Sequence, residues 1–150
     1  GSFNPPHRGH IQMMKKAKGR VEQAGYEVVV GIMAITNRTR LWQKNAKALP
    51  DQFRVDLINR LSQVEKQEKW LKGDIRGNEF KSYWQMTMSI LEKDYPEHAI
   101  FGVLGGDTCG GQFPDGPCVC VHREGCADPK EEIEKDHFLV ADEETHTYSS

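Results

Sequence analysis

The sequence predicts an α/β fold in which helices flank an open, mostly parallel sheet. Apolar, β-branched runs alternate with stretches whose apolar residues recur at helical spacing. Polar or glycine-rich segments follow the apolar runs, where parallel α/β proteins place their ligand-binding loops. With 150 residues, the chain is long enough for one domain with a core of ordinary size.

The chain is expected to begin with a helix, a strand and a loop. Apolar residues repeat at helical spacing over residues 10–24, and Gly25 is a natural stop. Residues 26–35 form an apolar, β-branched run, typical of a strand buried on both faces. Residues 36–48 are polar, basic and aperiodic, which predicts a loop at the carboxyl end of that strand.

A second helix, a short strand, a turn and a third helix are predicted next. Pro50 and Asp51 start a helix that runs to about residue 67. A short strand is expected at residues 70–71, a turn at 73–77 and a helix over 83–94. The apolar stripe of the first of these helices consists of Phe53, Leu57, Leu61 and Val64.

The last third of the chain is predicted to add strands. Residues 99–104 form a buried strand, and a glycine- and proline-rich loop then extends to residue 117. Further strands are expected at 118–122 and 137–141, with a short acidic helix beginning at residue 128 between them.

The first ten residues, GSFNPPHRGH, carry the most specific chemistry. They bring His7, His10 and several small-residue backbone amides to one helix entrance, where the helix dipole also favours an anion. Paired imidazoles there can donate hydrogen bonds to phosphate oxygens. The segment therefore predicts a phosphate site; the alternative is a proline-rich turn with two solvated histidines.

This segment resembles the H-x-G-H signature of the nucleotidylyltransferase superfamily, and the preceding G-S-F-N-P-P is most similar to the nicotinate and nicotinamide mononucleotide adenylyltransferases. The resemblance implies a Rossmann-like fold, His7 and His10 as the catalytic pair, and transfer of AMP from ATP, with Mg²⁺, to a pyridine mononucleotide. Pyrophosphate would be released. The alternatives are a cytidylyltransferase, another transfer to a phosphorylated small molecule, and a nucleotide-binding module without activity.

Other segments resemble the family's motifs in order. Residues 82–87 resemble S-Y-T-x-x-T, 105–107 resemble G-x-D, 123–125 resemble R-x-G, and 147–150 resemble the opening of S-S-T-x-x-R. The resemblance implies that Trp84 and Thr87 bind the acceptor, although the indole of Trp84 is interpreted first as core. The residues implied for ATP or phosphate are Gly1, Ser2, Phe3, Lys44 (or Lys47), Asp107, Arg123, Ser149 and Ser150.

The pattern departs from the family in three places. After Asp107, a glycine-rich stretch lacking Trp replaces the expected helix, which leaves the acceptor open. The strand expected before Gly1, and the Thr and Arg expected after Ser150, are absent. The chain is therefore interpreted as a slice of a longer protein. Arg54 matches a family arginine that braces the preceding loop or simply solvates its helix.

Three cysteines and a histidine form a rival site. Cys118, Cys120 and His122 would share one face of a strand, and Cys126 could complete a zinc site, which would suit a zinc-dependent interaction module. This spacing is uncommon for zinc, and buried thiols that fill the strand's core are the favoured interpretation, with a disulfide as a further option. Cys109 is a candidate reactive thiol without an evident partner.

Charge and hydropathy exclude some partners. With 20 basic and 22 acidic residues, the chain offers no overall attraction to nucleic acid or membranes, and its longest apolar run, 28–35, cannot span a bilayer. The basic segment 38–54 is the functional candidate, whereas the acidic segment 128–144 is interpreted as a solvated face. The protein is expected in the reducing cytoplasm, with a homo-oligomer possible.

Overall fold

The computed structural model describes residues 1–43, 47–129 and 136–140. Its contacts divide the chain into two compact units, one containing residues 1–11 and 29–98, the other residues 12–28 and 99–150. All paired strands in both units run parallel, which confirms the α/β class. That residues 1–150 form one domain stays a prediction.

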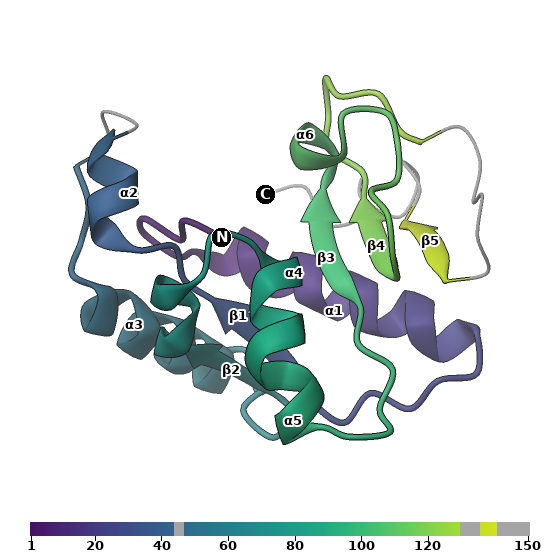
Figure 1. Ribbon diagram of the computed structural model, residues 1–150, viewed down its shortest axis with the longest axis horizontal. Coiled ribbons are helices and arrows are strands. Elements are labelled where there is room, and N and C mark those ends of the chain that lie inside the picture. The colour runs from purple at the N-terminus through teal and green to yellow at the C-terminus, as the bar shows by residue number, and fades with distance from the viewer. Residues whose placement is uncertain (44–46, 130–135, 141–150) are drawn as a thin grey trace. The chain divides into compact units, whose positions relative to one another are not determined.

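The first unit is built on two parallel strands, β1 (Gly31–Ala34) and β2 (Leu71–Asp74), with Gly31 opposite Leu71. Helix α3 (Asp51–Val64) packs on β2 (Figure 1). Gly73 makes this close packing possible, because a Cβ there would lie 3.2 Å from the Ile58 side chain. The Ser62 hydroxyl also donates to the Leu71 carbonyl at 2.7 Å, so the helix is fixed to the strand by both shape and hydrogen bonding.

Shorter helices complete the first unit. They are α2 (Arg38–Gln43), the 3₁₀ helix η1 (Ile75–Glu79), and a helix over 83–94 made of α4 (Tyr83–Met86), the π-helical η2 (Thr87–Leu91) and α5 (Glu92–Asp94). Ser82 caps α4 by accepting from the Gln85 amide. Gly77 lies so close to the end of β1 that a Cβ on it would meet Ala34 at 2.7 Å.

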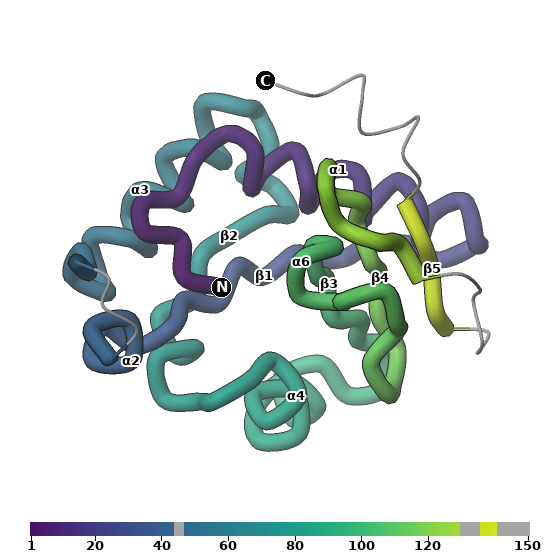
Figure 2. Tube along the Cα trace, turned by 90° about the horizontal axis from the view of Figure 1, so that it is seen from above, coloured from purple at the N-terminus to yellow at the C-terminus, as the bar shows by residue number. Residues whose placement is uncertain are grey.

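The second unit contains a three-stranded parallel sheet in the order β3 (Gly102–Gly105), β4 (Cys118–Val121) and β5 (His137–Val140). Figures 1 and 2 show these strands side by side, with α6 (Gly106–Cys109) at the end of β3. The central strand β4 is buried along its whole length. Helix α1 (Arg8–Gln23) enters this unit at Gln12. The buried core is Ala17, Val21, Val119, Val121, Phe138 and Val140.

The predicted strand 26–35 is wrong in its first half. Only residues 31–34 pair as a strand. Tyr26 instead makes edge contacts with Phe101 and Phe138 in the second unit, and Val28 packs against the same core. One apolar run thus supplies the cores of two units, which hydrophobicity alone does not reveal.

Three other predictions need correction. Part of the expected loop 36–48 is helical, because the Asn37 carboxamide accepts from the Thr39 amide and α2 buries Leu41. Strand β2 covers residues 71–74, where a two-residue strand and a turn were expected. The stripe predicted for α3 is displaced: Phe53 and Val64 are exposed, whereas Arg54, Val55, Ile58 and Ser62 are buried.

The remaining elements confirm the predictions with small differences at their ends. The strands expected at 99–104, 118–122 and 137–141 are β3, β4 and β5. The acidic helix expected from residue 128 falls mostly outside the described residues. Within the described ranges, no helix combines the length and apolar character needed to cross a bilayer.

Candidate functional site

The two imidazoles of the N-terminal motif stack on each other. The ring centroids of His7 and His10 lie 3.8 Å apart, with 28° between the ring planes. The Nδ1 atom of His7 accepts from the Gly9 amide at 3.0 Å, and the Nδ1 atom of His10 accepts from the His7 amide at 3.0 Å. Because an accepting nitrogen carries no proton, each neutral ring holds its proton on Nε2.

This geometry corrects one detail of the expected phosphate site. Backbone amides at the helix start were expected to face the ligand, but those of His7 and Gly9 are bonded to the imidazoles. The His10 amide likewise donates to the His7 carbonyl at 3.0 Å. These backbone hydrogen bonds therefore orient the two imidazole rings.

Gly9 leaves room for the His7 ring, and Phe3 contacts the His10 ring. A Cβ on Gly9 would lie 2.8 Å from Cε1 of His7, so only glycine leaves the ring its present place. The Phe3 ring meets His10 edge to face at a centroid distance of 4.9 Å. Phe3 has a φ of 45°, a conformation that costs a non-glycine residue free energy and is concentrated at functional sites.

Arg54 joins the N-terminal motif to helix α3 within the first unit. Its side chain is fully buried and donates to the Ser2 carbonyl at 2.8 Å, the Leu49 carbonyl at 3.0 Å and the Asp51 carboxylate. Asp51 also accepts from the Asn78 carboxamide and the Arg38 amide. Of the two roles considered for Arg54, the structure therefore shows the bracing one.

Asn4 also attaches the N-terminal motif to the segment before α3. Its side-chain oxygen accepts from the Leu49 amide at 2.9 Å, and its nitrogen donates to the Lys47 carbonyl. Gly1 adds a backbone link, since its carbonyl accepts from the Thr36 amide at 2.8 Å. The segment that precedes the imidazoles is thus bonded to three separate parts of the same unit.

The predicted acceptor residues have unlike environments. Trp84 is 45% exposed, so its interpretation as core is wrong, and its indole is accessible on α4. Thr87 is buried, and its hydroxyl donates to the Tyr83 carbonyl at 2.8 Å. Thr87 also begins the π-helical segment, a feature frequent at functional sites.

In the second unit, Asp107 and Arg123 meet at the carboxyl ends of β3 and β4. Their closest charged atoms are 3.7 Å apart, and both side chains are about half exposed. A Cβ on Gly105 would lie 2.8 Å from the Asp107 carboxylate, so this glycine allows the carboxylate to fold back beside the strand end. The predicted ribose-binding residue and the predicted phosphate-side arginine are therefore neighbours.

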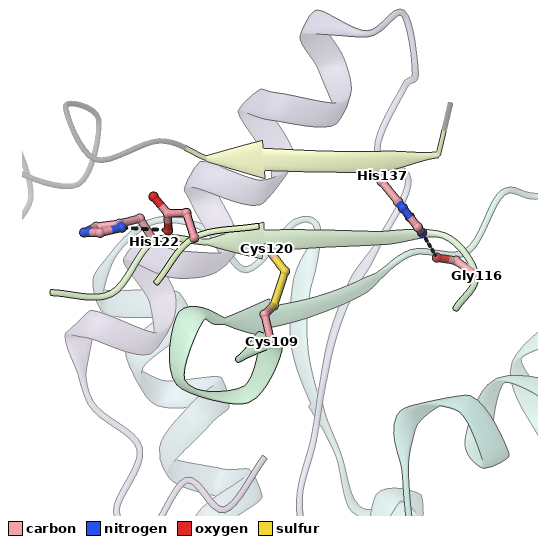
Figure 3. Close-up of a disulfide and its surroundings, with 6 residues drawn as sticks. Cys109, Gly116, Cys120, His122 and His137 are labelled. Carbon is pink, nitrogen blue, oxygen red and sulfur yellow. Dashed lines mark hydrogen bonds and ion pairs between the residues drawn. A yellow bond between two sulfur atoms is a disulfide. The ribbon is translucent and has the colours of Figure 1, made fainter. Parts of the chain in front are cut away.

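The four residues of the alternative zinc site do not come together. Cys120 forms a disulfide with Cys109, and His122 bonds through Nδ1 to the Asp128 carboxylate at 2.7 Å (Figure 3). Cys118 is a buried thiol in β4, as the core interpretation predicted, and Cys126 is half-buried. In the part of the chain that the structure describes, no three His, Cys, Asp or Glu side chains form a metal-binding group.

Some predicted residues cannot be placed, and some contributors escaped prediction. Lys44, Ser149 and Ser150 lie outside the described residues. Asn4 and the partner of Cys109 were missed: nothing in the spacing of Cys109 and Cys120 indicates a pair, because the loop between them sets their approach. The signal for Asn4 was its place beside two prolines within the motif.

Comparison with known proteins adds independent information. The model of a family described as Cytidylyltransferase-like matches residues 1–150. The chain is 25% identical over 116 residues to a nicotinamide/nicotinic acid mononucleotide adenylyltransferase 2 of Caenorhabditis elegans, covering 72% of this chain and 49% of that protein. It is 28% identical over 120 residues to a probable nicotinate-nucleotide adenylyltransferase of Exiguobacterium sibiricum, covering 72% and 53%. The chain spans about half the length of these curated relatives.

Proposed function

The chain belongs to the cytidylyltransferase-like family, and from that premise we propose that it transfers AMP from ATP to nicotinate or nicotinamide mononucleotide. The single observation that carries the proposal is the stacked His7–His10 pair, in which the Nδ1 atom of each ring accepts a backbone N–H. The names of the two relatives support the choice of acceptor.

The reaction requires positioning and charge stabilisation more than a protein nucleophile. A phosphate oxygen of the mononucleotide attacks the α-phosphorus of ATP, a new P–O bond forms, and the bond to the leaving pyrophosphate breaks. Negative charge grows on the oxygens around the α-phosphorus. Two N–H donors held by backbone hydrogen bonds stabilise that charge without having to reorganise.

Mg²⁺ belongs to this proposal as part of the ATP substrate. Imidazole N–H groups suit phosphate oxygens, whereas Mg²⁺ prefers oxygen ligands. Mg²⁺ in such reactions is held mostly by substrate phosphates and water, and it neutralises phosphate charge there.

The other predicted residues take separate roles in the proposal. The exposed indole of Trp84 offers a flat surface for a pyridine ring or ribose. Asp107 accepts hydrogen bonds from a ribose. Arg123, which lies beside it, binds either a phosphate or the adenine end of ATP. Thr87 is already bonded within its helix, so we assign it to shaping the surface beside Trp84. The cytoplasmic location and a homo-oligomer stay predictions.

The test is turnover by the full-length protein with Mg²⁺, using ATP or CTP and each of the two mononucleotides. We expect dinucleotide and pyrophosphate from ATP, and about a 100-fold or larger loss of turnover in His7→Ala and in His10→Ala. His98→Ala is the matched control, because His98 is an exposed histidine whose ring makes only local contacts in the described structure, with the Pro96 carbonyl and the Tyr95 ring.

Two outcomes would overturn the assignment. Turnover with CTP in place of ATP would favour the cytidylyltransferase alternative. Binding of ATP without turnover on any acceptor would favour a nucleotide-binding module that has no activity.

A further inference from the structure

We propose that Cys109 and Cys120 are a reversible thiol modification site whose disulfide holds the Asp107 segment in its binding conformation. The proposal rests on the proposed function only in taking Asp107 as a nucleotide-binding residue. The bond joins the last residue of α6 to the interior of the central strand β4 (Figure 3).

The segment that carries Asp107 has little structure of its own to hold it. Helix α6 has four residues, too few for a helix to be stable by itself. Gly110 and Gly111 follow it with φ of 60° and 84°, conformations that leave the chain easily redirected. The ion pair from Asp107 to Arg123 is long and half exposed, so it contributes little restraint.

The far end of the same loop is fixed by other contacts. His137 is buried at the start of β5, and its Nε2 lies 2.9 Å from the Gly116 carbonyl. The Phe113 ring stacks on the same imidazole at a centroid distance of 4.7 Å. Cleavage of the disulfide would therefore release the Asp107 end of the loop while residues 113–116 stay attached to the sheet.

Burial determines where the bond can be attacked. Cys120 is 1% exposed, whereas Cys109 is only half-buried, so in this proposal an external thiolate attacks the sulfur of Cys109, the more exposed partner. Attack forms a mixed disulfide with Cys109 and expels the Cys120 thiolate, which takes up a proton. When the reductant is a dithiol, its second thiol attacks the mixed disulfide and releases the Cys109 thiol. The protein thereby gains two electrons and two protons, and the reductant is oxidised to a disulfide.

The expected cytoplasmic location is one where a reversible disulfide can regulate binding. In the cytoplasm, where we expect the protein, disulfides are usually transient and serve catalysis or redox sensing. A cleavable bond two residues from Asp107 would couple nucleotide affinity to the local thiol balance. The oxidised protein is the state in which the binding segment is held.

The experiment compares the full-length protein before and after reduction with dithiothreitol. Alkylation and mass spectrometry establish which cysteines are bonded, hydrogen exchange reports the amides of residues 105–111, and calorimetry gives the affinity for ATP. We expect faster exchange in 105–111 after reduction and, if the held conformation falls to about a tenth of the population, about a tenfold weaker affinity.

Two variants make the comparison specific. Cys109→Ser is expected to match the reduced protein and to ignore dithiothreitol. Cys118→Ala is the matched control, since Cys118 lies on the same strand two residues from Cys120, is as buried, and forms no disulfide. It should respond to dithiothreitol as the unmodified chain does.

The outcomes separate the two proposals. Unchanged exchange in residues 105–111 after demonstrated reduction, or free Cys109 and Cys120 thiols in protein treated with oxidised glutathione, would overturn the redox site. If exchange responds but no state binds ATP, the redox site stands and the proposed nucleotide function fails.

Discussion

The most local determinant of the site is the absence of a side chain at Gly9. A methyl group there would lie 2.8 Å from His7, so the ring must turn or shift. We expect Gly9→Ala to reduce turnover by as much as about 100-fold, because displacements near 1 Å have such effects on a reaction that depends on positioning. Thermal unfolding should show that the variant remains folded.

Gly19 provides the control within the same helix. Apart from the backbone of its own helix and its chain neighbours, no atom of the described residues lies within 4 Å of a Cβ at that position, so Gly19→Ala should leave turnover unchanged. It should also raise the free energy of unfolding by about 0.5–1 kcal/mol, because alanine favours a helix more than glycine does. Equal loss of turnover in both alanine variants would show that the crowding at His7 is not what matters.

At the scale of elements, Arg54 connects α3 to the N-terminal motif. Arg54→Ala leaves Asp51 without its buried partner and the Ser2 carbonyl without a donor, and we expect a loss of about 3 kcal/mol in the free energy of unfolding. Urea denaturation measures it. Arg60→Ala, an exposed arginine on the same helix, should change stability by less than about 0.5 kcal/mol.

Asp74, at the junction of β2 and η1, should make the free energy of unfolding depend on pH. Burial opposes ionisation of Asp74, but hydrogen bonds and charge from Arg76 outweigh it and lower the pKa of this carboxyl. The stabilisation from a lowered pKa is present above the unfolded-state value, about 3.9, and is lost as the pH falls through the folded-state value. The stability difference between the unmodified chain and Asp74→Asn should therefore shrink below about pH 4, in urea titrations at several pH values.

The same elements show what sequence could and could not predict. The helix-and-strand order followed from periodicity, since short apolar runs bounded by turn residues, such as 99–104 and 118–122, favour strands. The face of α3 was mispredicted because a buried arginine counts as polar in any stripe, while exposed Phe53 counts as apolar. For the site, the placement of both imidazoles at one helix start followed from the motif, but their stacking did not. The support from Arg54 depends on carbonyl positions that no spacing encodes.

At the scale of the whole molecule, the disulfide between Cys109 and Cys120 adds a covalent constraint to the described part of the chain. It closes a loop with a sequence separation of 11 residues. By loop-closure entropy, Cys109→Ser should lower the free energy of unfolding by about 3 kcal/mol relative to the oxidised protein. Urea denaturation with and without dithiothreitol measures this, and a variant as stable as the oxidised chain would contradict it.

The π-helical turn at Thr87–Leu91 has a consequence for the helix that follows it. Each residue added to an α-helix rotates the next by about 100°, so the wider turn sets the angular phase of everything beyond it. Asp94 meets Arg76 at 2.8 Å in that phase. Deleting Met88 would regularise the turn and swing Asp94 away from its arginine, so a shorter and locally better helix would lose its attachment to η1.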